Sequence, residues 1–293
     1  MVHIFECPAC GSNELVPHLT CEDHTVSHET FQIVMCGVCN LAITSPQPES
    51  ADLGRYYESE EYISHSGKTT GLSSVYHLAR SYHLKWKKSL IKTYATKGSV
   101  LDFGCGTGEF LQTMKKAGWS IFGVEPSDLA RQKASGLKGS KIVADIHQLH
   151  KDNFTIITLW HVLEHLPNLN EMLQMLLSKL DTNGTLFLAV PNYESADAQK
   201  YQSHWAGYDV PRHLWHFSKK SMTHLVAKAG AKIVNIVPMK LDAYYVSILS
   251  EKYRRNNHMT VSCLVSGILA GLTSNARAGQ DNYSSLIYIV QKS

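Results

Sequence analysis

The stretch GSVLDFGCGTGEFL, residues 98–111, constrains the fold of this chain more than any other. Residues 100–103 predict a buried strand, and helical apolar spacing begins near Glu109. The loop between them carries three glycines, which permit a tight turn. A strand, a glycine loop and a helix in this order form the first unit of a nucleotide-binding sheet.

The spacing of the glycines indicates what the loop binds. Dinucleotide-binding folds use G-x-G-x-x-G, which brings a pyrophosphate to the N-terminus of a helix. Here Gly104, Gly106 and Gly108 follow G-x-G-x-G, and Asp102 comes just before the loop. A carboxylate at this place suits a ligand with an ammonium group better than one with phosphates. The spacing therefore disfavours a dehydrogenase.

The next predicted strands also end in acids. Residues 120–127 predict a second strand that ends at Glu125, where a carboxylate can accept hydrogen bonds from both ribose hydroxyls. Residues 141–149 predict a third strand with Asp145 at its end, in reach of an adenine amino group. Further strands are predicted at 154–166 (running into a helix), 184–192 (after a Gly-Thr turn and a helix near 169–180), 231–239 and 284–292.

These motifs together resemble a known family. VLDFGCGTGEFL, FGVEPS, ADI and WHVLEHLPN, in this order, resemble the motifs of class I S-adenosylmethionine (SAM)-dependent methyltransferases over about residues 98–293. HVLEHLPN is similar to quinone-biosynthesis methyltransferases. The N-terminal CPAC and CGVC, with YDVPRHLWHFS (208–218), are similar to zinc-ribbon methyltransferases, including those that C-methylate nucleotide-linked sugars.

The resemblance implies a fold, a cofactor and a set of contacts. The fold would be α/β, a Rossmann-like methyltransferase sheet of seven strands with the last antiparallel. SAM would be the cofactor and S-adenosylhomocysteine the product, with Trp160 and His161 on the methionyl–sulfur side. The predicted cofactor contacts are Asp102, Gly104, Cys105, Gly106, Gly108, Glu125, Pro126, Asp145, Ile146, Trp160 and His161.

Four cysteines near the N-terminus predict a metal site. Cys7-x-x-Cys10 and Cys36-x-x-Cys39 would each aim two thiolates at one point, and two such turns make a tetrahedral zinc site. Four protein ligands close the site, so the zinc would be structural. The alternative is a redox pair or two unrelated coincidences. The odd total of seven cysteines argues against a disulfide scaffold.

His161-x-x-Glu164-His165 matches on paper the H-x-x-E-H pattern of inverted zinc proteases. A motif counts only in its structural context, and the methyltransferase motifs around it explain the segment without a metal. Glu164 and His165 are therefore expected to fix the local helix and loop by hydrogen bonding.

Histidines are the candidates for a general base, because their pKa lies near neutrality. His161, His213 and His216 are the predicted catalytic residues, and Arg212 could clamp an acidic substrate group. The alternative is that the loop at 208–218 merely packs over the cofactor site, with Ser218 capping the next helix.

The predicted organisation is a zinc ribbon at 1–45, a linker and helical lid at 46–97, and a methyltransferase domain at 98–293. A helical insertion at about 240–280 would cap the substrate pocket. The longest apolar run, near 261–272, is shorter than the roughly 18–20 residues needed to span a bilayer. A secretory signal is not recognisable at the N-terminus, so a soluble cytoplasmic protein without a membrane partner is expected.

The predicted function is SAM-dependent methylation of a small-molecule acceptor, on oxygen or carbon. The acceptor would be a nucleotide sugar or another biosynthetic intermediate. The alternative is a zinc-ribbon RNA methyltransferase. A net charge of +3 does not indicate nucleic acid, and the fourth strand lacks the Asn/Asp-Pro-Pro-aromatic turn that resembling base-amino methyltransferases use. A homodimer is left open.

Overall fold

The structure is a computed structural model. It describes residues 1–49, 51–57, 73–137, 139–279 and 282–293, with backbone only at 73–79. Residues 58–72, part of the predicted linker and helical lid at 46–97, lie outside the described residues.

A seven-stranded sheet forms the centre of the fold. Its strand order is β10-β11-β8-β7-β4-β5-β6. The neighbouring pairs from β8 to β6 are parallel, and β11 is antiparallel to both β8 and β10. This confirms the predicted methyltransferase sheet with an antiparallel last strand. The strands are β4 (Ser99–Phe103), β5 (Ser120–Val124), β6 (Lys141–Val143), β7 (Phe154–Trp160), β8 (Leu180–Pro191), β10 (Ala231–Pro238) and β11 (Ser285–Lys292).

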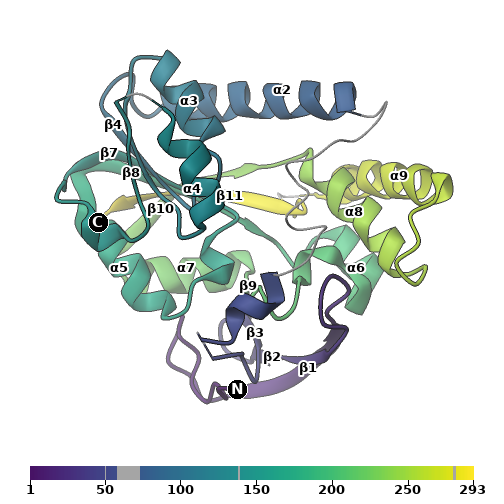
Figure 1. The fold of residues 1–293 in the computed structure, drawn as a ribbon. Helices are drawn as coiled ribbons and strands as arrows, with labels where there is room; N and C mark the ends of the chain where they lie inside the picture. The colour runs from purple at the N-terminus through teal and green to yellow at the C-terminus, as the bar shows by residue number, and fades with distance from the viewer. Residues whose placement is uncertain (50, 58–72, 138, 280–281) are drawn as a thin grey trace.

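Both faces of the sheet are covered, so its middle strands are apolar throughout. Along β4, Val100 packs into one hydrophobic cluster, while Leu101 and Phe103 pack into the cluster on the opposite face. Helices α2 (Ser73–Lys92) and α3 (Glu109–Lys116) lie on one side, and α5 (Leu169–Lys179) and α7 (Lys219–Lys228) on the other (Figure 1). Helix α4 (Asp128–Ser135) connects β5 to β6.

A second, four-stranded antiparallel sheet lies at the bottom of Figure 1. It contains β1 (Leu15–Glu22), β2 (Thr30–Cys36), β3 (Ala42–Thr44) and β9 (Trp215–His216). Strand β9 lies far from the other three in the sequence, after β8 of the main sheet. It joins them because Ile43 of β3 pairs with Trp215 of β9. The N-terminal strands are therefore joined by strand pairing to a segment that follows β8 of the main sheet.

The insertion before the last strand is helical, as predicted. Helices α8 (Asp242–Tyr253) and α9 (Val261–Arg277) pack on each other beside α6 (Ala196–Tyr201), at the right of Figure 1. Gly267 allows a close approach of the two helices. A Cβ there would lie only 2.5 Å from the Ile248 Cα.

Three local predictions were wrong. The third strand ends at Val143, because the Asp145 side chain caps a 3₁₀ turn at Ile146–Gln148. The predicted turn at Gly184 lies inside β8, where a Cβ would come 2.8 Å from the Phe154 carbonyl oxygen. The fourth strand does not run into a helix. It ends at Trp160, and a 3₁₀ turn at Leu163–His165 precedes α5.

Among the described residues, no helix is both long enough and apolar enough to cross a membrane.

Candidate active site at the carboxyl edge of the sheet

The glycine loop leaves the sheet at the end of β4. In the sheet, β4 lies between β5, the next strand in sequence, and β7, so the strand order reverses at this point. This switch point is where open α/β sheets bind ligands. Gly104, Gly106 and Gly108 have φ angles of 75°, 52° and 79°. Such left-handed angles favour glycine. At Gly104 there is also no room, because a Cβ would lie 2.5 Å from a methyl group of Val162.

Glu125 holds the loop from the neighbouring strand. Its carboxylate accepts hydrogen bonds from Gly106 N at 2.8 Å and from Ser127 N at 2.9 Å, one on each oxygen. Each oxygen keeps a second lone pair that a ligand hydroxyl could use. Asp145 lies two residues beyond the end of β6, exposed, with one oxygen accepting a hydrogen bond from His147 N at 2.8 Å. The three glycines and the two acids therefore line the same edge.

Asp102, at the end of β4, is almost completely buried. Burial raises the pKa of its carboxyl to about 7, against a 2.7 Å hydrogen bond donated by Thr158 Oγ1 and the nearby charge of Lys87. A buried carboxyl with so high a pKa gains from a cationic partner. This agrees with the sequence argument that the site suits an ammonium group.

A lysine that sequence reasoning missed reaches this site from α2. Lys87 Nζ lies 4.2 Å from the ring centroid of Trp160, in cation–π geometry. Burial lowers the pKa of Lys87 to about 8, while Asp242 and Asp102 act in the opposite direction. Nothing in the sequence separates Lys87 from the other lysines of KWKK, because only the tertiary contact selects it.

His161, predicted as cofactor contact and base, lies between two carboxylates. Its Nε2 is 2.9 Å from Asp242 Oδ2, and its Nδ1 is 3.3 Å from Glu164 Oε1. Burial alone would lower the pKa of His161, but the nearby carboxylates of Asp242 and Glu164 raise it to about 9. The imidazole is therefore charged at neutral pH and has no free lone pair with which to accept a proton.

The other two predicted catalytic histidines lie toward the ribbon. His216, in β9, is buried with its Nε2 3.0 Å from Thr44 Oγ1, and burial lowers its pKa well below the usual value. His213 is buried too, and its Nδ1 lies 2.9 Å from the Gly207 carbonyl oxygen. The structure thus brings His161 to the edge of the sheet beside Trp160, whereas His216 joins the ribbon sheet.

Arg212 is also part of this junction and is not free to clamp a substrate. Its guanidinium donates to Asp23 at 2.8 Å, to Asp209 at 2.7 Å and to the Tyr56 carbonyl at 2.8 Å. The side chain is 1% exposed. Asp23, from the β1–β2 hairpin, gave no signal in the sequence, because its partner lies 189 residues away.

His165 connects the two regions through its side chain, and Glu164 does so through its backbone carbonyl. The Glu164 carbonyl accepts from Leu214 N at 2.8 Å, and His165 Nδ1 lies 3.1 Å from the Arg212 carbonyl oxygen. The Glu164 carboxylate, His165 and His213 also offer atoms within 4.8 Å of one another. Burial and the nearby His213 lower the pKa of His165 to about 4.

The four N-terminal cysteines come together as predicted. Cys7 and Cys39 Sγ atoms are 3.4 Å apart, and Cys10 and Cys36 Sγ atoms are 3.5 Å apart. A tetrahedral zinc with Zn–S bonds of about 2.3 Å separates its sulfurs by about 3.8 Å. All four are free thiols within one cluster, so the donor set and spacing fit zinc. Cys21, Cys105 and Cys263 are buried elsewhere.

Comparison with known proteins now decides the family. Residues 77–236 match the model of the family described as "Methyltransferase domain". The chain belongs to this family. The matched span begins within α2 and ends within β10, and it includes Lys87, the glycine loop, Glu125 and His161.

The methyltransferase domain is similar to curated ubiquinone biosynthesis O-methyltransferases. That of Actinobacillus pleuropneumoniae is 35% identical over 106 residues, which cover 32% of this chain and 45% of the relative. That of Coxiella burnetii is 33% identical over 125 residues, covering 40% and 52%. The chain thus spans about half the length of the curated relatives that it matches.

Solved structures agree on the fold. Geranyl diphosphate C-methyltransferase from Streptomyces coelicolor A3(2), crystallised with Mg²⁺, geranyl diphosphate and S-adenosyl-L-homocysteine, covers 84% of this chain and 90% of its own at 13% identity and a TM-score of 0.51. Coclaurine N-methyltransferase covers 73% and 72% at 15% identity and a TM-score of 0.50. At these identities the similarity concerns the fold alone.

Proposed function

We propose that this protein is a SAM-dependent methyltransferase that acts on a small-molecule acceptor. The observation that carries the proposal is the position of Glu125. Its carboxylate is tied to the glycine loop through Gly106 N, so the ribose-binding acid and the loop form one prearranged surface. The family membership and the similarity to methyltransferases of small molecules support the same conclusion.

Bound SAM would supply a methyl group already activated on a sulfonium. The residues of this chain then bind and orient. Glu125 and Asp145 would accept hydrogen bonds from the ribose and the adenine. Asp102 would receive the cationic methionyl end, because a buried carboxylate gains from a positive partner. Holding the reactants in line supplies much of the rate of such a transfer.

On the acceptor side, we propose that His161 acts as a positive charge and not as a base. Held between Asp242 and Glu164, it remains protonated at neutral pH. A fixed imidazolium would stabilise an acceptor that reacts as an oxyanion or an enolate, and so suits methylation on oxygen or carbon. A nucleotide sugar or another biosynthetic intermediate remains the proposed acceptor class.

We also propose that the four-cysteine cluster binds structural zinc, as its sulfur spacing supports.

Among the described residues, no specific observation favours the RNA methyltransferase alternative. The cytoplasmic location, the domain boundaries and the homodimer remain predictions from the sequence.

The proposed activity is tested by incubating the purified full chain with methyl-labelled SAM and a panel of phenols, enols and nucleotide sugars. We expect S-adenosylhomocysteine and an acceptor whose mass increases by one methylene unit. Asp242→Asn should slow the transfer, because it weakens the hold on the His161 charge. Binding of SAM without transfer to any member of the panel would reject the proposed acceptor class. Failure to bind SAM at all would reject the enzyme assignment.

A further inference from the structure

The outer helix of the insertion exposes an unusual amount of apolar surface. Five large apolar side chains of α9 are between 45% and 77% exposed. These are Val261, Val265, Ile268, Leu269 and Leu272. Contiguous exposed apolar surface of this kind marks an interaction site on most soluble proteins.

The exposed residues share one face of the helix. At about 100° per residue, the five positions fall within an arc of about 100°. The buried residues of α9 occupy the opposite side, toward α8, and they are Cys263, Gly267, Ala270, Gly271 and Ser274. The small residues bring α9 close to α8, so the apolar stripe is held outward on a packed support. Its side chains face solvent and are not covered by other described residues.

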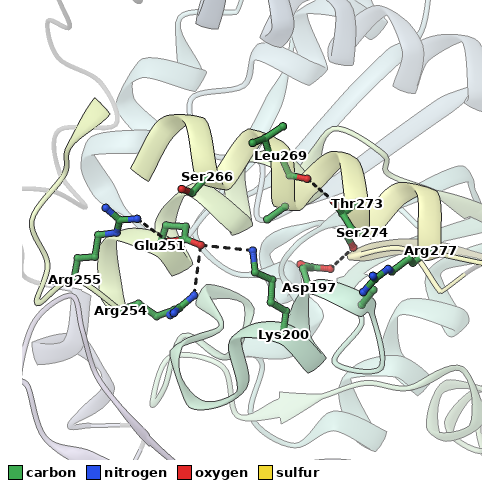
Figure 2. Close-up of a pocket in the computed structure, with 12 residues that line it drawn as sticks. Asp197, Lys200, Glu251, Arg254, Arg255, Ser266, Leu269, Thr273, Ser274 and Arg277 are labelled. Carbon is green, nitrogen blue, oxygen red and sulfur yellow. Dashed lines mark hydrogen bonds and ion pairs between the residues drawn. The ribbon is translucent and has the colours of Figure 1, made fainter. Parts of the chain in front are cut away.

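A cavity of about 670 Å³ lies beside this stripe of apolar side chains, between α6, α8 and α9 (Figure 2). Leu269 belongs to both the stripe and the cavity lining. Four cationic side chains also line the cavity: Lys200, Arg254, Arg255 and Arg277. The exposed stripe therefore has a band of positive charge along one side.

The acids of the cavity do not neutralise this band. Glu251, 6% exposed, is shared by three cations at 3.5–3.6 Å, as the dashed lines in Figure 2 show. Asp197 is buried and accepts hydrogen bonds from Trp205, Ser274 and Ser284. The sequence of α9 itself contains no acidic residue. An excess of positive charge thus remains at the rim.

We propose that the α8–α9 face, defined by the apolar stripe and the four cavity cations, docks on the surface of an anionic lipid bilayer. The stripe would enter the interface between headgroups and acyl chains, and the cations would contact lipid phosphates in the cavity. An apolar helical face with cations beside it is the arrangement of interfacial membrane helices. The protein would lie on the membrane without crossing it, although the sequence led us to expect no membrane partner.

The proposal is independent of the proposed activity, although the two regions are connected. Helix α8 begins at Asp242, which pairs with His161 at the edge of the sheet, and ends near Arg254 at the cavity. A bilayer at this face would therefore lie at the far end of the helix that holds the candidate site.

The test is cosedimentation of the full chain with vesicles of phosphatidylcholine alone and of phosphatidylcholine mixed with phosphatidylglycerol. We expect binding to the mixed vesicles only, weakened by added salt. Leu272→Asp should lower the partition coefficient about tenfold, and Arg277→Glu about fivefold, since each basic residue near an anionic surface contributes about 1 kcal/mol. Both side chains lie at the surface, and unchanged thermal unfolding would show that the variants fold.

Matched controls come from α4, on another side of the molecule. Leu129 is 68% exposed and Lys133 is exposed, so Leu129→Asp and Lys133→Glu repeat the same changes away from the proposed face. We expect both to bind mixed vesicles as the parent does. Loss of binding in the controls as well as in the face variants would overturn the proposal, because binding would then reflect overall charge.

Four other outcomes also overturn it. The first is absence of vesicle binding at low salt. The second is a dimer in sedimentation equilibrium that Leu272→Asp dissociates, which would assign the stripe to a second copy of this chain. The third is saturable binding of inorganic phosphate or a nucleoside diphosphate in the cavity, lost in Arg277→Glu, without vesicle binding. The fourth is a preference for a short RNA over mixed vesicles in competition.

Discussion

The carboxyl edge of the sheet and the ribbon junction both concentrate buried charge, but they satisfy it differently. At the junction, the Arg212 guanidinium has protein partners in Asp23, Asp209 and the Tyr56 carbonyl. At the edge, Asp102 is buried with a pKa raised to about 7, and Trp160 Nε1 has no hydrogen-bond partner among the described residues. The first arrangement holds two sheets together, whereas the second retains capacity for a ligand.

This difference separates residues that looked alike in the sequence. His161, His213 and His216 all follow strands of the main sheet, and all were candidates for one role. His216 is taken into the ribbon sheet by β9, and His213 packs beside it, while His161 remains at the edge with Asp242. The buried Arg212 charge is paired within the protein and stabilises the junction, whereas the buried Asp102 carboxyl, with its raised pKa, indicates a site.

The largest expected effect is at the ribbon. Cys36→Ala removes one of four proposed zinc ligands, and structural zinc contributes about 10–16 kcal/mol of apparent binding energy in small folds. We expect loss of near-stoichiometric zinc in elemental analysis and a lower unfolding temperature. Cys263→Ala, a buried cysteine outside the cluster, should keep its zinc. A parent protein that contains no zinc would reject the proposed metal site.

The junction should be the next most sensitive region. Arg212→Met leaves the buried Asp23 carboxylate unpaired, which costs about 3–5 kcal/mol of stability. Denaturant unfolding measures this loss, and SAM affinity of the folded fraction should not change. Lys179→Met, which breaks an ion pair with the exposed Asp152, should cost about 1 kcal/mol or less. Equal losses in the two variants would contradict the special role of the junction.

At the edge, Glu125→Ala should weaken SAM binding about 100-fold, because each hydrogen bond to a charged group contributes about 1.5–3 kcal/mol. Equilibrium dialysis with labelled SAM measures the change. Glu171→Ala, on the exposed side of α5, is the matched control and should bind SAM as the parent does. An unchanged affinity in Glu125→Ala would show that the ribose lies elsewhere.

The histidines separate the two regions in turnover. His161→Asn should lower kcat about tenfold or more, because a fixed positive charge is lost from the acceptor side. His216→Asn should keep kcat and lower only stability, since that ring contacts Thr44 in the ribbon. Steady-state kinetics with an identified acceptor decides between the two. A larger kcat effect at His216 would reverse the comparison.

The smallest expected effect concerns Lys87. Below its pKa of about 8 the side chain is charged and repels a sulfonium ligand, so SAM affinity of the parent should rise as the pH passes through about 8. Lys87→Met should bind SAM a few-fold more tightly at neutral pH, with a flatter pH profile. Lys85→Met, an exposed neighbour on α2, should retain the parent profile. A Lys87→Met protein that binds SAM more weakly would contradict this.

Much of the edge could be predicted from the sequence, because the information is local. The strand, the glycines and the acid at each strand end lie within a few residues of one another, so periodicity and turn chemistry locate Glu125. The four cysteines were also recognisable from their spacing. The antiparallel last strand followed from the family resemblance, not from the residues.

The remainder depends on contacts between distant segments. Asp242 reaches His161 over 81 residues, and Lys87 reaches Trp160 over 73. In the sequence, nothing distinguishes Asp242 or Lys87 from acidic and basic residues that are exposed to solvent. His216 looked like a site residue because its loop follows β8, but its pairing with β3 spans more than 170 residues. No local pattern encodes such a pairing.

The most direct test is calorimetric titration of the purified chain with SAM, S-adenosylhomocysteine and NADH. The account predicts one saturable site for SAM and for S-adenosylhomocysteine, no heat from NADH, and loss of the SAM signal in Glu125→Ala. A site that takes NADH in place of SAM, or no binding of any of the three, would contradict it.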